Sequence, residues 1–595
     1  MTTKTARNPV ILAALPGVLG ILLEFGGCTG GLQAIDARTE RLLREASDRI
    51  GAPAAPALAS DVYARGDSLS FPDDEQFEPE TVNPAATELE FTPREILEQE
   101  IDEEAHDVIG RLDEGDPAQD AAGLQLDIAA ALALAQQHSR EYRSAEEDYI
   151  LSALRLLIER HLWGPRFFDE MSATAVGRAD EGAYDSALEL VNELTVTQRL
   201  PYGGEVSARL LARATEDLRE LVAGEEVSSA ELVLDADLPL LRGAGLAARD
   251  SRIQAERDLI YSARDFENFR REFLVDIATD FLGLVVQQQS IANAETRLVR
   301  LRDFLVREEE LLNAGRSTRF DAALVAQDVL FAEDDLRSTQ ESYRLAVDRF
   351  KVRLGLPVDE EVVIVPSSLG LPTPATNDAE AVRMALAYRL DLQTERDEVA
   401  DALRQIDVAK NNLLPDLNIA GSFSIPTEAG ERRPGLGLTT DESTYAAGIT
   451  FGLPLDREIE RLNLRQAQIA AERAQRDYTE FRDNVVVEVR DAVREIGRAL
   501  FSLELQEENI GIARLRLESI EAAPDRATAR DRSEAADALT EALDDRDGAV
   551  RDLEVAILNY LLSTGTLRVQ ADGAIEPLSG MDLNPQIGDE NRGGG

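Results

Sequence analysis

The feature that most constrains the fold is an internal duplication of one helical apolar pattern. Apolar residues recur at spacings of three and four through two long segments, which is the pattern of coiled-coil helices. A shift of 212 positions superposes the two stripes: Phe273 on Val485, Ile277 on Val489, Phe281 on Val493, Leu284 on Ile496, Ile291 on Leu503, Leu298 on Ile510, and Leu305 on Leu517. The chain therefore contains two copies of one long helical unit.

Each copy predicts a very long helix followed by a shorter return helix. Residues 249–312 contain no proline, and at about 1.5 Å per residue they would extend roughly 96 Å, far more than an ordinary globular domain needs. Gly355 and Gly565 follow the return helices in the position of C-terminal caps. The long helices are predicted over 249–312 and 458–522, and the return helices over 319–354 and 533–562.

A block of predicted strands precedes each long helix, and each block follows a helix that ends at a proline. A shift of 250 places Pro165 on Pro415 at these helix ends. Alternation is clear over 416–425, where apolar side chains fall on one face, as in a strand between lipid and water or in an edge strand of a soluble sheet. The strands are predicted over 166–176, 193–200, 205–212 and 229–240 in the first block, and over 416–425 and 444–455 in the second.

The first strand block is longer than two strands require. Tyr202-Gly203-Gly204 marks a turn, and residues 215–224 indicate a further helical or loop segment, so we expect an added hairpin or loop. Trp163, Phe167 and Phe168 lie at the change from helix to strand. They suit an aromatic belt at a lipid interface, with packing in a protein core as the alternative.

Composition excludes several classes of function. The 62 basic and 113 acidic residues give a formal charge of −51, which repels phosphate backbones and argues against nucleic-acid binding. Three scattered histidines and one cysteine form no zinc or redox cluster, although sites made of carboxylates alone remain open. The sequence also lacks a nucleophile-base set and a phosphate loop, so we expect no enzyme activity and no cofactor.

The N-terminus has the pattern of an export signal. Lys4 and Arg7 precede an apolar run over 10–23 that is too short for a mature transmembrane helix. Cys28 follows Phe25-Gly26-Gly27, which resembles a bacterial lipobox and predicts lipidation of Cys28; the alternative is an incidental cysteine near an ordinary cleavage site. The predicted domains are a signal peptide (1–28), an acidic tether (29–119), a first repeat (120–370), a second repeat (371–570) and a flexible tail (571–595).

The repeated order of helix, strands, long helix and return helix resembles the TolC-like outer-membrane efflux protein family over residues 124–569. Three short stretches carry the resemblance in detail. They are Leu124-Gln125-Leu126-Asp127 before the alanine-rich segment 130–135, Leu240-Leu241-Arg242-Gly243-Ala244-Gly245 before the first long helix, and Leu311-Leu312-Asn313-Ala314-Gly315-Arg316-Ser317 with Asp321 at its far end.

The resemblance implies an α+β membrane protein with internally duplicated long α-helical hairpins. Each protomer of a homotrimer would give two strand hairpins to one shared β-barrel and four helical strands to a periplasmic α-barrel. The implied function is a passive exit duct in the outer membrane for a tripartite efflux or type I secretion system. Its partners would be outer-membrane lipid, a periplasmic membrane-fusion adaptor and an inner-membrane pump of the RND, ABC or a similar type.

The same resemblance assigns candidate site residues. Gly315, Arg316, Ser317 and Thr318 correspond to the periplasmic tip at which an adaptor docks, although a simple helix-hairpin turn needs the same residues. In the second copy Ala527 replaces Gly315 and Pro524 intrudes, so residues 523–533 predict a remodelled tip.

Carboxylates near the first tip are candidates for the channel entrance. Glu308, Glu309 and Glu310 precede the turn by little more than one helical turn, and rings of acidic residues make a pore prefer cations. The alternative for each is a solvated helix face. A structural coiled-coil protein of the envelope, without a pore, is the rival to the channel, but it does not explain the duplicated strand blocks.

Overall fold

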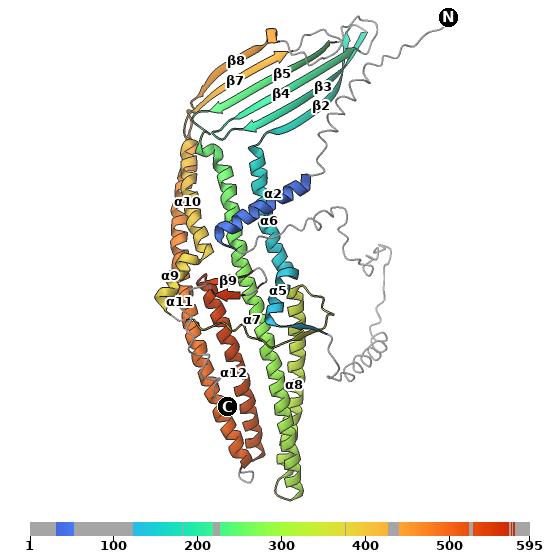
Figure 1. The fold of residues 1–595 in the computed structure, drawn as a ribbon, viewed down its shortest axis with the longest axis vertical. Helices are drawn as coiled ribbons and strands as arrows, with labels where there is room; N and C mark the ends of the chain where they lie inside the picture. Colours follow the sequence, from blue (N-terminus) through green and yellow to red (C-terminus); the bar gives the residue numbers. More distant parts are fainter. Residues whose placement is uncertain are drawn as a thin grey trace, which may run out of the picture. The chain divides into compact units, whose positions relative to one another are not determined.

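The computed structural model describes residues 31–52, 123–180, 183–217, 227–374, 377–426, 440–522, 528–570, 573 and 575–577. These residues fall into two compact units. The smaller unit contains two short parallel strands, β1 (Leu124–Leu126) and β6 (Val362–Ile364). The larger unit contains the long helices and a six-stranded sheet (Figure 1).

The larger unit confirms the duplication at the level of whole elements. Each half contributes two helices before its strands, then a long helix and a return helix. The first half has α5 (Ile128–His138), α6 (Arg140–Leu162), α7 (Leu246–Asn313) and α8 (Arg319–Leu354). The second half has α9 (Asp378–Tyr388), α10 (Leu390–Asn411), α11 (Glu458–Ala522) and α12 (Ala529–Ser563). The starts of α5 and α9, like those of α6 and α10, are 250 positions apart, which is the predicted shift.

The duplicated apolar stripe forms the core between the helices. Both members are buried in the pairs Phe273 and Val485, Ile277 and Val489, Phe281 and Val493, Leu284 and Ile496, and Leu298 and Ile510. Farther along the helices, one apolar cluster joins α7, α8, α11 and α12, so the two hairpins pack against each other. Burial of this stripe, rather than helix propensity, is what stabilises helices of such length.

The helices lie side by side in a constant order. Next to the sheet, α7 packs between α6 and α10, and α10 packs against α11. Toward the other ends of the long helices, α8 and α12 take the places of α6 and α10 beside α7 and α11. At each level the chain therefore provides a wall that is four helices wide.

The sheet is antiparallel with the order β2-β3-β4-β5-β7-β8. Its strands are β2 (Arg166–Asp180), β3 (Ala183–Arg199), β4 (Glu205–Asp217), β5 (Val227–Pro239), β7 (Asp416–Pro426) and β8 (Thr444–Gly452), with a short 3-10 helix η2 (Thr440–Glu442) before β8. All six predicted strands are confirmed, and so is the added hairpin. The implication of two hairpins per protomer is wrong for this chain, because four strands, not two, separate α6 from α7.

Three predicted boundaries change for identifiable reasons. The strand β3 begins at Ala183 instead of residue 193, because its ladder to β2 continues to the pair of Asp180 and Ala183. Residues 215–217 continue β4 instead of forming a helix or loop, because the ladder to β5 extends to Thr215 and that to β3 extends to Asp217. Residues 218–226 lie outside the described part of the chain. The helix α12 begins at Ala529, four residues before the predicted start, because Thr528 and Asp531 form a capping box.

The predicted flexible ends contain ordered elements. The helix α2 (Gly31–Ile50) lies within the predicted tether, with Leu42, Leu43 and Ala46 buried and the Tyr149 hydroxyl donating to the Leu43 carbonyl over 3.1 Å. Within the predicted tail, β10 (Ile575–Pro577) pairs with β9 (Leu567–Val569). The predicted signal peptide with Cys28, and residues 53–119 of the tether, lie outside the described residues.

No helix in the described ranges combines the length and the apolar character needed to cross a membrane.

Candidate functional site

The first tip is a tight turn between α7 and α8. Gly315 adopts a φ of 71°, a left-handed conformation that glycine takes without steric cost. The Thr318 side chain accepts from the Asp321 backbone amide, and the Asp321 carboxylate accepts from the Thr318 backbone amide, so a capping box begins α8. Gly315, Arg316 and Thr318 are exposed, whereas Ser317 is half-buried. The four predicted tip residues therefore lie together, and the docking role remains a prediction.

Glu308 is a connection between the two hairpins and not an open carboxylate. Its side chain is 5% exposed, accepts from the Ser317 hydroxyl, and forms a 3.0 Å ion pair with Arg532 at the start of α12. A buried charge is stable only with such partners. Glu308 is therefore removed from the predicted entrance carboxylates, while Glu309 and Glu310 are exposed and stay candidates.

A second polar contact reinforces the same junction. The Ser533 hydroxyl donates to the Asp328 carboxylate of α8 over 2.6 Å. Arg532 and Ser533 thus bring the start of α12 against both helices of the first hairpin. Within the predicted remodelled tip, residues 523–527 lie outside the described residues, and residues 528–533 contain the N-cap at Thr528 and the first turn of α12.

Sequence reasoning missed two residues at this end. Arg532 lies in a charged stretch of the sequence, where nothing distinguishes it from its neighbours. Its role follows only from its ion pair with Glu308, which is 224 positions away. Phe320, between the two capping-box residues Thr318 and Asp321, is 74% exposed. A large apolar side chain on an exposed tip is a feature of contact surfaces, and its position next to Thr318 could have indicated it.

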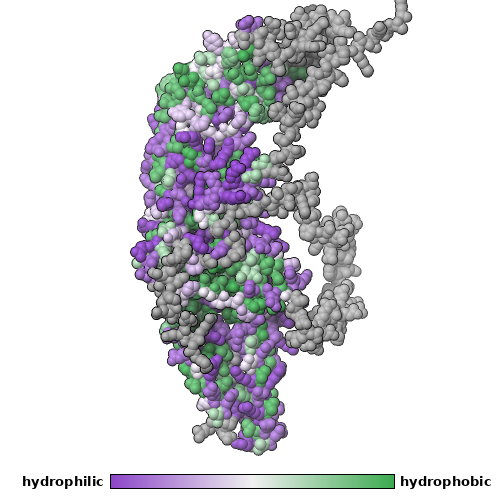
Figure 2. All heavy atoms as spheres, viewed as in Figure 1, coloured by the Kyte–Doolittle hydropathy of each residue, from purple (hydrophilic) through white to green (hydrophobic). Residues whose placement is uncertain are grey.

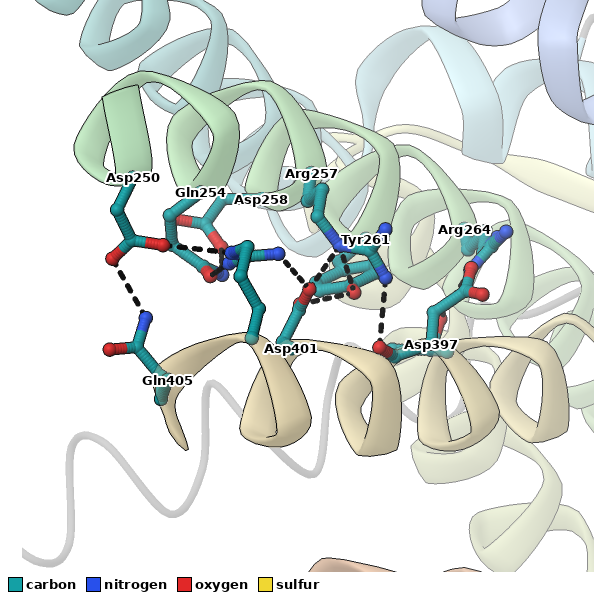
Figure 3. Close-up of polar contacts among 11 residues, drawn as sticks. Asp250, Gln254, Arg257, Asp258, Tyr261, Arg264, Asp397, Asp401 and Gln405 are labelled. Atoms are coloured by element: carbon teal, nitrogen blue, oxygen red, sulfur yellow. Dashed lines mark hydrogen bonds and ion pairs between the residues drawn. The ribbon is translucent and has the colours of Figure 1, made fainter. Parts of the chain in front are cut away.

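Nearer the sheet, α7 and α10 are joined by a polar seam (Figure 3). Asp401 is buried and accepts hydrogen bonds from Tyr261 over 2.6 Å and from Arg404 over 2.5 Å, and it pairs with Arg257. The seam continues through the 2.8 Å Arg264–Asp397 and Arg404–Asp250 ion pairs. Burial alone would raise the pKa of Asp401, but the hydrogen bonds from Tyr261, Arg257 and Arg404 outweigh it and lower that pKa.

The sheet has one apolar and one polar face, fixed by its register and strand alternation. The apolar face runs across the strands through Val196, Val206, Ala208, Leu210, Leu232, Leu234, Leu238, Leu417, Ile419, Phe423, Tyr445, Ile449 and Phe451. Asp169 and Asn192 interrupt this face and hydrogen-bond to each other over 3.0 Å. Figure 2 shows the apolar residues gathered over the sheet, next to a largely hydrophilic surface over the adjoining helices.

The apolar face is uncovered. Tyr445 is 85% exposed, and Ile449 and Phe451 are also exposed. Phe167 and Phe168 were predicted for an aromatic belt or a core. Phe167 is exposed on this face and Phe168 is exposed on the opposite face, which argues against core packing. The opposite face is polar and includes a 2.8 Å Arg209–Glu193 ion pair.

Among the described residues no group of three or more His, Cys, Asp or Glu side chains could hold a metal ion.

Long duplicated hairpins joined to an antiparallel sheet also occur in proteins of known family and structure. The model of the family described as outer membrane efflux protein matches residues 381–526, which span most of α9 and all of α10, β7, β8 and α11. The resemblance inferred from the sequence is thereby confirmed.

Solved structures of outer-membrane channels share the fold. CusC is 13% identical, with a TM-score of 0.56 over 76% of this chain and 95% of its own. The outer-membrane channel OprN is 15% identical, with a TM-score of 0.55 over 74% of this chain and 89% of its own. The CmeC outer membrane channel of Campylobacter jejuni is 13% identical, with a TM-score of 0.54 over 74% and 85%. No curated protein matches the sequence.

Proposed function

We propose that this chain is a passive outer-membrane channel, the exit duct of a tripartite efflux or type I secretion system. It acts as a homotrimer, with the sheets of three copies closed into one barrel in the outer membrane and the helices extending into the periplasm. The proposal contains no catalytic step and no cofactor.

The sheet is the observation that carries this proposal. An apolar face with side chains as exposed as Tyr445 and Ile449 is costly in water, where each large apolar side chain loses about 1.5–3 kcal/mol relative to burial. In a bilayer the same face meets lipid, and the polar face meets a water-filled lumen. The rival coiled-coil protein without a pore gives no reason for such a sheet.

The two sheet edges support closure by further copies. The strands β2 and β8 each have a neighbour on one side only within the described sheet. Unpaired backbone groups cannot face lipid without a cost of several kcal/mol each, so a membrane sheet must close. The strand β2 leaves a helix and β8 returns to one, so β8 of one copy would run antiparallel to β2 of the next, as in the rest of the sheet.

The exposed tip supports contact with a periplasmic membrane-fusion adaptor, which would connect the duct to an inner-membrane pump of the RND, ABC or a similar type. Gly315, Arg316, Ser317 and Thr318 would form the docking surface together with Phe320, whose exposed ring offers an apolar anchor. Glu309 and Glu310 would face the entrance and favour cations. Lipidation of Cys28 would add an anchor in the outer membrane.

Electron cryomicroscopy of the full-length protein in detergent tests the proposal. We expect a three-fold particle with a barrel in the micelle and a hollow helical cylinder of twelve helices, four from each copy. A monomeric rod, or a sheet that stays open in the micelle, would contradict the channel and favour the structural coiled coil.

A further inference from the structure

The first strand block contains a complete additional hairpin. The strand β2 follows α6 and β5 precedes α7, so these two strands are the direct continuations of the helices. Between them β3 and β4 form a hairpin whose turn, at residues 200–204, lies at the helical end of the sheet. In the second half β7 and β8 continue α10 and α11 with no strand inserted between them.

The added hairpin is built into the base of the sheet. The Gly245 amide, at the start of α7, donates to the Tyr202 carbonyl over 2.7 Å. Gly204 has a φ of 86°, and a Cβ atom there would lie 2.0 Å from the Asp237 carbonyl oxygen of β5. Only glycine fits so close to the neighbouring backbone, so the turn is fixed between β5 and α7 rather than loosely attached.

The added strands also continue the apolar face, with Asn192 of β3 as the polar interruption already described. Leu194 and Val196 of β3 lie opposite Leu210 and Ala208 of β4, and Leu210 in turn lies opposite Leu232 of β5. A hairpin that folded into the lumen as a plug would need polar residues on both faces. The pairing therefore assigns β3 and β4 to the lipid-facing wall.

The width of the wall agrees with this assignment. Six strands about 4.8 Å apart and tilted by about 40° occupy roughly 38 Å of circumference. Four helices at interaxial distances of about 8–10 Å occupy roughly 32–40 Å. Four strands would occupy only about 25 Å of circumference. The added hairpin therefore makes the width of the sheet equal to that of the four-helix wall next to it.

We infer that three copies close an 18-stranded barrel, which is wider than the 12-stranded barrel that two hairpins per copy would give. This inference rests on the proposed trimeric channel. The expected backbone diameter is about 36 Å, against about 24 Å for twelve strands, because barrel diameter grows almost linearly with strand number. A barrel of this size leaves an open aqueous lumen and suits bulky solutes, so the helical tips, and not the barrel, become the narrow part of the duct.

Strand counting in a cryomicroscopy map of the full-length trimer tests the inference without any variant. Eighteen strands and a diameter near 36 Å are expected. A trimer with twelve strands, and with β3 and β4 outside the barrel or inside its lumen, would overturn the enlarged barrel but leave the channel intact. A particle that is not trimeric would overturn both.

Deletion of residues 183–217 provides a matched comparison. It removes β3 and β4 and leaves residues 181–182 and 218–226 to connect β2 with β5, which run antiparallel. If the variant assembles, its barrel should have twelve strands and a diameter about 1.5-fold smaller than that of the full-length chain. An unchanged diameter would show that the hairpin lies outside the barrel wall.

Discussion

The Arg532 guanidinium of α12 donates a 3.0 Å hydrogen bond to the Glu308 carboxylate of α7, so a buried ion pair joins the two halves of the internal duplication close to the first tip. Ser317 of the turn donates to the same carboxylate, so the turn, the long helix and the second hairpin share one polar centre. Loss of either charged partner leaves the other buried and unpaired, which makes this contact a point at which the tips can be loosened.

Replacement of Arg532 by methionine should loosen the tips by leaving Glu308 buried without its cation. Removal of one partner of a buried pair costs about 3–5 kcal/mol. Hydrogen exchange of residues 300–320 and 529–540 should therefore become faster. The exposed Arg530, which pairs with Glu534, is the control, and R530M should leave exchange near the first tip unchanged. Equal protection in R532M and wild type would contradict the role of the pair.

The double variant Glu308→Gln with Arg532→Met separates charge from packing. Since both charges are gone, no unpaired ion remains in the interior, and part of the lost protection should return. If the double variant exchanges as fast as R532M alone, the effect of Arg532 comes from its packing and not from its charge.

Asp401→Asn should weaken the seam between α7 and α10 in a pH-dependent way. The folded-state pKa of Asp401 is lowered, so its carboxylate stabilises the fold above the unfolded pKa of about 3.9, and this stabilisation is lost as the pH falls through the folded-state pKa. At pH 7 the free energy of unfolding of D401N should be about 1–2 kcal/mol smaller than that of wild type, so its melting temperature should be lower. At acidic pH the two melting temperatures should approach each other. Asp407→Asn, at an exposed pair with Lys410, should change little at either pH.

Gly204→Ala should block assembly of the sheet. The new Cβ would lie 2.0 Å from the Asp237 carbonyl oxygen, and the positive φ adds about 1–3 kcal/mol of strain. We expect less of G204A in the outer-membrane fraction as heat-resistant oligomer. Gly448→Ala in β8 is the control, because nothing lies within 4 Å of a Cβ there. Normal assembly of G204A would show that the turn is not fixed against β5.

Glu309→Gln combined with Glu310→Gln should reduce preference for cations. Both side chains are exposed near the first tip, where rings of carboxylates from three copies would concentrate cations. The reversal potential in a potassium chloride gradient should move toward zero. The exposed Glu341 of α8 pairs with Arg344, and E341Q serves as the control. An unchanged reversal potential in the double variant would identify both residues as solvated surface.

The helices and strands could be predicted from the sequence because their signals are local. Each signal can be read within one segment of the sequence. The signals are the periodic apolar residues, the glycines after α8 and α12, and the alternation over β7. Prediction also found the hairpin at Tyr202, since turn residues there separate two alternating runs. The helix α2 was missed because its buried residues Leu42, Leu43 and Ala46 stand in an otherwise charged segment.

The tip could be placed from the sequence but not its contacts. Glu308, Glu309 and Glu310 are identical in type and adjacent, and only the packing of α12 buries the first of them. The capping box of Thr528 and Asp531 was visible in the sequence, but the nearby proline and the charged stretch suggested a remodelled tip. A contact between two residues that are 224 positions apart, such as Glu308 and Arg532, can be seen only in the folded structure.

The conductance of the purified full-length protein in planar lipid bilayers tests the central claim most directly. The account predicts discrete ion-conducting steps, small in wild type and larger in R532M, because the Glu308–Arg532 pair holds the tips together. Protein that inserts into the bilayer but gives no steps in wild type or in R532M would contradict a channel.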